Sequence, residues 1–276
     1  MTNKHQLLVQ SILTTALQRT PKHQIISECA GSYGYSDLND RIAKLGNVLT
    51  TLGFGKGSVV AVMDWDTHRY LECFFAIPMV GAVLHTINIR LAPAQIAYTI
   101  DHAEDDLIII NSDFLPLLRE FLPLVKRKLC FVLIGDSHKE TSQDIGLVIE
   151  SNFEIMMNAA KPDFDFPYFD ENLRATTFYT TGTTGEPKAV AYSHRQLVLH
   201  TMGILSTFGP MASSNRLHHG DVYMPITPMF HVHGWGFPYA ATSLGLGQVY
   251  PGQYKADKLV RLIHKHKVTF SHCVPT

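Results

Sequence analysis

The stretch SVVAVMDWDTHRYLECFFAIPMVGAVLHTIN, residues 58–88, carries the pattern on which the fold prediction rests. It opens with the β-branched run 58–63 and closes with the apolar run 82–88, and both read as strands. Between them a helical segment begins near Thr67, and Pro78 should kink or end it. A strand, a helix and a strand in this order predict a parallel pair joined by a right-handed crossover.

The same alternation continues on both sides of this stretch. Before it, apolar residues at three- and four-residue spacing predict a helix that Ser36 can cap and Gly53 can end. After it, Pro93 is placed to begin a helix, and the runs 106–111 and 128–135 read as strands separated by a leucine-rich helix. Strands that are apolar throughout predict an α/β fold of mostly parallel sheets flanked by helices, with ligands beyond the carboxyl ends of the strands.

Residues 138–175 interrupt this alternation with prolines and acidic residues among aromatics, which predicts an irregular connector. The strand–helix pattern resumes from residue 221 and stops after a last strand candidate. We therefore divide the chain into a first α/β subdomain with its connector, residues 1–170, and the incomplete start of a second, residues 171–276. A parallel strand without its crossover helix leaves a sheet face uncovered, so we expect a truncated piece of a longer protein.

The composition predicts a globular protein without a strong overall field. The net charge is −1 and 17% of the residues are charged, so overall charge recruits neither nucleic acid nor an anionic membrane. The longest apolar run, residues 73–84, is too short to span a bilayer, and the N-terminus lacks the apolar core of a signal peptide. We expect a cytoplasmic protein without a transmembrane segment, whose four separated cysteines are buried and reduced.

A loop rich in threonine and glycine follows the connector, with the sequence YTTGTTGEPKAVAYSH over residues 179–194. Gly182 and Gly185 permit positive φ, and successive amides in such a turn form an anion-binding nest. Lys188 adds a compact positive charge suited to phosphate, and Ser193 can cap the next helix. Only two residues separate the glycines, which excludes a Walker A loop. From composition alone, a hairpin that binds nothing is the alternative.

This loop resembles the phosphate-binding signature of adenylate-forming enzymes, with Thr181 where serine is common and Ala189 where glycine is common. The block PITPMFHVHGWGFPYAATSLGLGQVYPG, residues 225–252, resembles the substrate-pocket motif of that superfamily, most closely in its fatty acyl-CoA synthetase branch. A third block, NIRLAPAQIAYTIDHAEDDLIII, residues 88–110, is similar to a segment ahead of the loop in that branch. The resemblance implies the first part of the large N-terminal domain of an adenylate-forming enzyme, without the C-terminal lid domain.

The resemblance also implies a two-step reaction that uses ATP, Mg²⁺ and coenzyme A. The carboxylate of a medium- or long-chain fatty acid attacks the α-phosphate of ATP, and the thiol of coenzyme A then attacks the acyl-AMP. The first step gathers negative charge, so it needs preorganised donors and a cation around the phosphates. The family's metal-binding glutamate, ribose-binding aspartate and lid lysine lie in later blocks. We therefore expect this chain alone to bind nucleotide weakly and not to turn over.

Site residues follow from the resemblance, residue by residue. The implied phosphate cradle consists of Thr180, Thr181, Gly182, Thr183, Thr184, Gly185 and Lys188. Lys188 is implied in catalysis as well, and Thr180 in the Mg²⁺ site. In the second block the implied residues are His231 beside the reacting carboxylate, Val232 on the adenine side, and His233, Gly234 and Trp235 around the substrate, with Trp235 at the mouth of a fatty-acyl tunnel.

Several alternatives stay open at this point. On an extended segment, His231 and His233 share one face and suit a metal hydrolase, while Trp235 suits a core position equally well. Asn88 and Arg90 fit either the pocket or a surface ion pair. Within the superfamily an aryl-CoA ligase or a peptide-synthetase adenylation domain is an alternative, and outside it a non-catalytic nucleotide- or acyl-binding module. Acyl chain length, coenzyme A against a carrier protein, and assembly as a homodimer are left undetermined.

Overall fold

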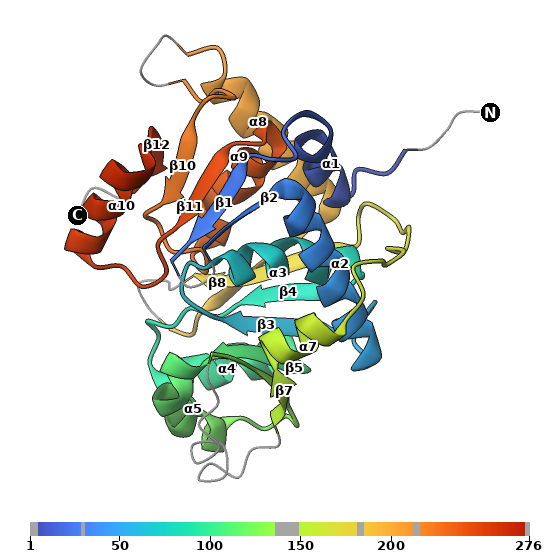
Figure 1. Ribbon diagram of the computed structural model, residues 1–276. Helices are drawn as coiled ribbons and strands as arrows, with labels where there is room; N and C mark the ends of the chain where they lie inside the picture. The colour runs from blue at the N-terminus through green and yellow to red at the C-terminus, as the bar shows by residue number, and fades with distance from the viewer. Residues whose placement is uncertain (1–4, 29–30, 136–148, 181–184, 212–215, 274–276) are drawn as a thin grey trace.

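Two β-sheets lie on either side of helix α3 (His68–Met79) in the structure, a computed structural model that describes residues 5–28, 31–135, 149–180, 185–211 and 216–273 (Figure 1). Helix α3 contacts β1 of one sheet and β3, β4 and β8 of the other. Every residue of α3 except Arg69 is buried, which its apolar sequence allows. Thr67 precedes its first turn and Pro78 lies one residue before its end, as predicted.

The larger sheet has seven strands and contains the pair predicted from residues 58–88. Val60 of β3 lies beside Leu84 of β4 in a parallel register. All neighbours are parallel except β8 and β9, which form an antiparallel hairpin. In spatial order the strands are β7 (Ile149–Asn152), β6 (Cys130–Ile134), β5 (Leu107–Asn111), β3 (Val59–Met63), β4 (Val83–Thr86), β8 (Arg174–Thr180) and β9 (Lys188–Ser193).

Both faces of this sheet are covered by helices. Alternate residues of its strands point to opposite sides and so enter different cores. Val60 and Val62 face the core shared with α2 and α3, while Ala61 and Met63 face the core under α4 and α5. Burial of each valine or methionine side chain here contributes about 1.5–3 kcal/mol. The covering helices are α2 (Tyr35–Thr51), α4 (Pro93–Ala103), α5 (Leu115–Phe121) between the 3₁₀ turns η1 (Ser112–Phe114) and η2 (Leu122–Leu124), and α7 (Phe153–Ala159).

The smaller sheet joins the two ends of the described chain. Strand β1 pairs in parallel with β11, with Ile26 beside Val249, although these residues are far apart in sequence. In spatial order the strands are β12 (Phe270–His272), β10 (Val222–Pro225), β11 (Gly247–Tyr250), β1 (Gln24–Ser27) and β2 (Gly31–Gly34). One face packs against α8 (His194–Phe208), α9 (Phe237–Leu244) and α1 (Gln10–Arg19), and the other against α10 (Ala256–His266).

The two sheets do not coincide with the two subdomains that we divided at residue 170. The hairpin β8–β9 follows that boundary in sequence but completes the first sheet, whereas β1 and β2 precede it and belong to the second. The connector 138–175 also contains regular structure, since β7 and α7 lie within it. Its remaining described part, residues 160–173, has no helix or strand, as expected.

Three smaller expectations need correction or completion. Helix α2 is capped by Gly34, whose amide donates to the Asp37 carboxylate at 2.8 Å, and not by Ser36. Cys73 is buried, but Cys130 is half-buried and Cys273 exposed. Cys29 lies outside the described residues. No helix in the described part of the chain is long and apolar enough to cross a membrane.

Candidate active site

The predicted phosphate loop leaves the seven-stranded sheet at the carboxyl end of β8. Thr180 and Lys188 form the last pair of the β8–β9 ladder; Thr180 is half-buried and Lys188 exposed. Gly185 has φ +107°, a backbone conformation that glycine adopts without strain. The structure therefore brings Thr180 and Lys188 together at the open end of the hairpin, with Gly185 three residues before Lys188, while Thr181, Gly182, Thr183 and Thr184 lie outside the described residues.

Tyr179 fastens one side of the hairpin to helix α4 and strand β4. Its hydroxyl lies 2.8 Å from Nδ1 of His102, and its ring lies 5.2 Å from that of His85. His85 is buried and bonds through Nδ1 to Asp105 at 2.8 Å. Burial raises the pKa of the Asp105 carboxyl, and the adjacent His85 opposes this rise. Sequence reasoning missed these supports, because each residue comes from a different element.

The other side of the hairpin packs on His233, which lies in an aromatic cage. Its ring meets Phe178 of β8 at 5.1 Å, Tyr192 of β9 at 6.4 Å and Phe74 of α3 at 5.7 Å, all edge to face. His233 is buried, and burial lowers its pKa to about 3, so it is neutral. Its Nε2 has no hydrogen-bond partner among the described residues. The two predicted motifs are thus in direct contact, with His233 behind the hairpin.

Residues 232–236 form a left-handed turn. The φ angles are +50° for Val232, +55° for His233, +56° for Gly234 and Trp235, and +76° for Gly236. This region strains residues with a Cβ by about 1–2 kcal/mol each. Gly236 has no room for a side chain, since an added Cβ would lie 2.6 Å from the ring of His200. Such backbone strain is typical of functional sites.

This turn corrects the extended segment that the metal-site alternative required. His231 is half-buried at the start of the turn, whereas His233 points into the core. Burial, together with the charge of Arg90, lowers the pKa of His231. Val232 is half-buried and Gly234 buried. Within the described ranges, no group of three or more His, Cys, Asp or Glu gathers to hold a metal ion.

Trp235 is half exposed and lines a cavity of about 430 Å³. Aromatic rings dominate its wall, and the ring of His272 stacks on Phe237 at 4.6 Å. Thr227 and Ser271 add hydroxyl groups. The lining residues are Phe208, Thr227, Trp235, Phe237, Thr269, Phe270, Ser271, His272 and Cys273. The turn therefore directs Trp235 toward an apolar space and away from the core.

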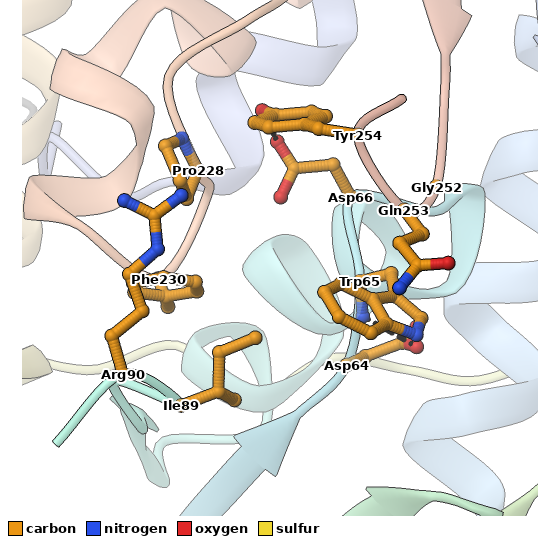
Figure 2. A pocket seen from close by; sticks show the side chains of 10 residues that line it. All are labelled: Asp64, Trp65, Asp66, Ile89, Arg90, Pro228, Phe230, Gly252, Gln253 and Tyr254. Carbon is orange, nitrogen blue, oxygen red and sulfur yellow. Dashed lines mark hydrogen bonds between the residues drawn. The ribbon is translucent and has the colours of Figure 1, made fainter. Parts of the chain in front are cut away.

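A second cavity, of about 210 Å³, lies between the two sheets at the carboxyl ends of β3, β4, β10 and β11 (Figure 2). Arg90 lines it and stands over the Phe230 ring at 6.0 Å, without an ion pair among the described residues. Asp66 and Tyr254 face each other on its wall, and the sequence alone did not single out either residue. Arg90 thus belongs to a pocket, the first of the two readings that its sequence left open.

Comparison with known proteins supports the sequence resemblance. A family model described as AMP-binding enzyme matches residues 13–276. The chain is 37% identical over 276 residues to a 3-methylmercaptopropionyl-CoA ligase from Ruegeria pomeroyi, covering 98% of this chain and 50% of that protein. It is also 37% identical over 243 residues to a long-chain-fatty-acid–CoA ligase from Thermus thermophilus, covering 88% and 42%.

Solved structures share the fold. A long-chain-fatty-acid–CoA ligase from Archaeoglobus fulgidus matches with a TM-score of 0.81 at 22% identity, over 99% of this chain and 52% of that chain. At this identity the likeness speaks for the fold alone. The chain spans about half the length of the curated relatives it matches.

Proposed function

The chain belongs to the AMP-binding enzyme family, and from this premise we propose that it forms part of an acyl-CoA ligase that activates a fatty acid. The proposed reaction forms an acyl-AMP from a carboxylic acid and ATP, and then an acyl-CoA. Relatives that act on long-chain and medium-chain fatty acids, each more than 30% identical, support this substrate class. The relative named for 3-methylmercaptopropionate makes a short thioether acid a second substrate to test.

The observation that carries the proposal is the contact between the two motifs. The ring of His233 packs against Phe178 and Tyr192, one from each strand of the hairpin. Phe178 lies two residues before Thr180 and Tyr192 four residues after Lys188, which supports a site that combines the 232–236 turn with the open end of the hairpin. A carboxylate near His231 would then lie next to a phosphate held at the hairpin, as the first step requires.

In the first step a carboxylate oxygen attacks the α-phosphorus, and the bond to the oxygen of the β-phosphate breaks. Pyrophosphate leaves with the electron pair of that bond. In this proposal the Lys188 ammonium and the amide of Gly185 would donate to phosphate oxygens bound at the open end of the hairpin. Thr180 offers a hydroxyl oxygen, a donor of the kind Mg²⁺ binds, and Mg²⁺ neutralises phosphate charge when bound. His231, kept neutral by its lowered pKa, can accept or donate a hydrogen bond at the carboxylate.

The cavity beside Trp235 is the proposed site of the acyl tail. Its aromatic lining favours an apolar chain, and the half-exposed indole stands at its rim. In the second step the thiol sulfur of coenzyme A attacks the acyl carbon, and AMP departs with the electrons of the acyl–phosphate bond.

The test is acid-dependent pyrophosphate release by the chain extended to its natural stop codon. Acids of increasing chain length, 3-methylmercaptopropionate and benzoate would be compared. Lys188→Ala should lower kcat/KM about 100-fold, because it removes a cation from the phosphate site. Lys22→Ala removes an exposed lysine from the turn before β1 and serves as the matched control. If no acid releases pyrophosphate, the ligase proposal fails and a non-catalytic binding module becomes the better reading.

A further inference from the structure

A single carboxylate joins three segments that are distant in sequence. Asp66 follows β3 in the seven-stranded sheet, and its side chain is 3% exposed. One carboxylate oxygen accepts the Met229 amide at 2.9 Å, and the other accepts the Tyr254 hydroxyl at 2.5 Å. The Asp66 carbonyl also accepts the Gly252 amide at 2.8 Å. Figure 2 shows Asp66 and Tyr254 facing each other on the wall of the 210 Å³ cavity.

The segment held by Asp66 leads directly into the candidate active site. Met229 is buried, and the Phe230 carbonyl accepts a hydrogen bond from Thr86 of β4 at 3.0 Å. His231 follows, and its carbonyl accepts the Gly234 amide at 3.0 Å. The left-handed turn that begins at residue 232 gains little from local propensity, so contacts on either side must hold it. The bond to Asp66 is the last carboxylate contact before that turn among the described residues.

We propose that Asp66 is a positioning residue, whose ionised carboxylate fixes the segment from Met229 to His231 against the seven-stranded sheet and thereby sets the left-handed turn. This inference rests on the proposed function, because it treats that segment as part of the acyl-activating site. Asp66 itself touches no reacting atom in this scheme. It acts through the Met229 amide, and the bond is strongest when the carboxylate is charged.

The surroundings of Asp66 make its charge dependent on pH. Burial raises its pKa to about 7, against the hydrogen bonds from Met229 and Tyr254, which lower it. The neighbouring Asp64 raises the pKa further, and the guanidinium of Arg90 lowers it. The Asp64 carboxylate itself accepts hydrogen bonds from Thr67, Asn111 and the Trp65 amide. The titratable and charged groups that face Asp66 are Asp64, Tyr70, Arg90, Tyr223, Tyr250 and Tyr254.

The direct test follows the Met229 amide by NMR in this chain, with its nine methionines labelled with ¹⁵N. The Met229 signal is assigned with Met229→Leu. Its amide proton should move upfield as the pH falls through 7, because a neutral carboxyl is the weaker acceptor. Asp66→Asn should abolish this titration, and Asp64→Asn, the matched control on the adjacent buried carboxyl, should keep it. A flat Met229 signal in the wild type, or an unchanged titration in Asp66→Asn, overturns the proposal.

A second test uses catalysis by the extended chain. The wild type should lose activity as the pH falls through the Asp66 pKa, and Asp66→Asn should be slow at all pH values without that acid limb. Tyr254→Phe removes one bond to the charged form, so the limb should shift upward by at least about half a pH unit. A purely structural role would lower activity without shifting the acid limb of the pH–activity profile. That result would contradict the positioning role.

The two tests separate the two ways of failing. If no variant or wild type activates any acid, the proposed function fails, while the Met229 titration still decides what Asp66 holds. If acids are activated but the Met229 amide signal does not follow the titration of Asp66, the proposed ligase function is kept and the positioning role is rejected. Circular dichroism of each variant checks that it is folded, and the wild-type titration requires no substitution at Asp66.

Discussion

Phe178 and His233 meet edge to face, with ring centroids 5.1 Å apart and planes at 89°. Phe178 belongs to β8 of the larger sheet, and His233 to the segment after β10 of the smaller one. The contact therefore links the β8–β9 hairpin of the larger sheet to the 232–236 turn that follows the smaller one. An edge-to-face pair of aromatic rings is also a favourable arrangement of charges. Loss of this contact should be felt both in stability and at the site.

Phe178→Ala should lower the free energy of unfolding by about 3–5 kcal/mol, because it leaves a cavity beside His233. Urea denaturation measured at one pH would give the difference. Ile155→Ala, on a residue that is 65% exposed, is the control and should change stability by about 0.5 kcal/mol or less. A loss below about 1 kcal/mol for Phe178→Ala would contradict the close packing described above.

Gly236→Ala should destabilise the protein, whereas Gly203→Ala should not. At Gly236 the φ of +76° and the His200 ring 2.6 Å from an added Cβ both oppose a side chain. We expect a loss of about 2 kcal/mol or more from strain and overpacking. Gly203 lies in α8 with open space at its Cβ, and alanine there should stabilise by about 0.5–1 kcal/mol. Thermal unfolding of the two variants would show opposite signs.

His194 should make the protein less stable in acid. It is buried, its Nδ1 accepts the Val9 amide at 3.3 Å, and burial lowers its pKa to about 4. The unfolded chain binds this proton near pH 6.5, so stability present above that pH is lost as the pH falls toward 4. At pH 5 the loss from this group is about 2 kcal/mol.

His194→Asn tests this pH dependence, since an amide oxygen can replace Nδ1 as acceptor without titrating. The variant should be less stable than the wild type at pH 8, and the gap should shrink by about 2 kcal/mol at pH 5. Urea midpoints at the two pH values suffice. Because His68, His233 and His272 also have pKa values lowered by burial, only the difference between variant and wild type isolates His194. An unchanged gap would argue against a buried neutral imidazole.

Arg41→Ala should cost about 3–5 kcal/mol, because it leaves Glu72 buried without its cation. The Arg41 Nε lies 2.5 Å from Glu72, whose side chain is fully buried, and the same guanidinium bonds to Glu154. Arg261→Ala is the matched control, since Arg261 is exposed and its partner Glu28 keeps Lys258. That change should cost about 1 kcal/mol or less. If guanidinium denaturation gave equal losses of unfolding free energy for the two variants, burial of the Arg41–Glu72 pair would make no difference to its contribution to stability.

Much of the fold was predictable from local pattern. The runs at 58–63, 82–88 and 106–111 are mostly apolar, so their strands and the helices between them follow from length and residue type. The hairpin at the threonine-rich loop pairs two strands that are adjacent in sequence, so it also depends on local pattern. In contrast, β2 has the sequence GSYG, which carries no strand signal, and its neighbour β1 depends on distant pairing with β11.

The site was predictable only as far as its motifs extend. Sequence placed His231, His233 and Trp235 in one block, but it could not show that His233 points inward, since the left-handed turn has no local propensity behind it. From the sequence alone, Asp66 was only one polar residue between a predicted strand and a predicted helix. Its importance comes from Met229 and Tyr254, which only the folded chain brings to it.

The pairing of β1 with β11 has a consequence for how the chain folds during synthesis. The seven-stranded sheet can close once residue 193 has left the ribosome, because all of its strands have then been made. Strands β1 and β2, although they emerge among the first residues, have no parallel neighbour until residues 247–250 appear. The N-terminal strands must therefore wait with an open edge until those residues have been made, a slow, non-local closure that invites pairing with other chains.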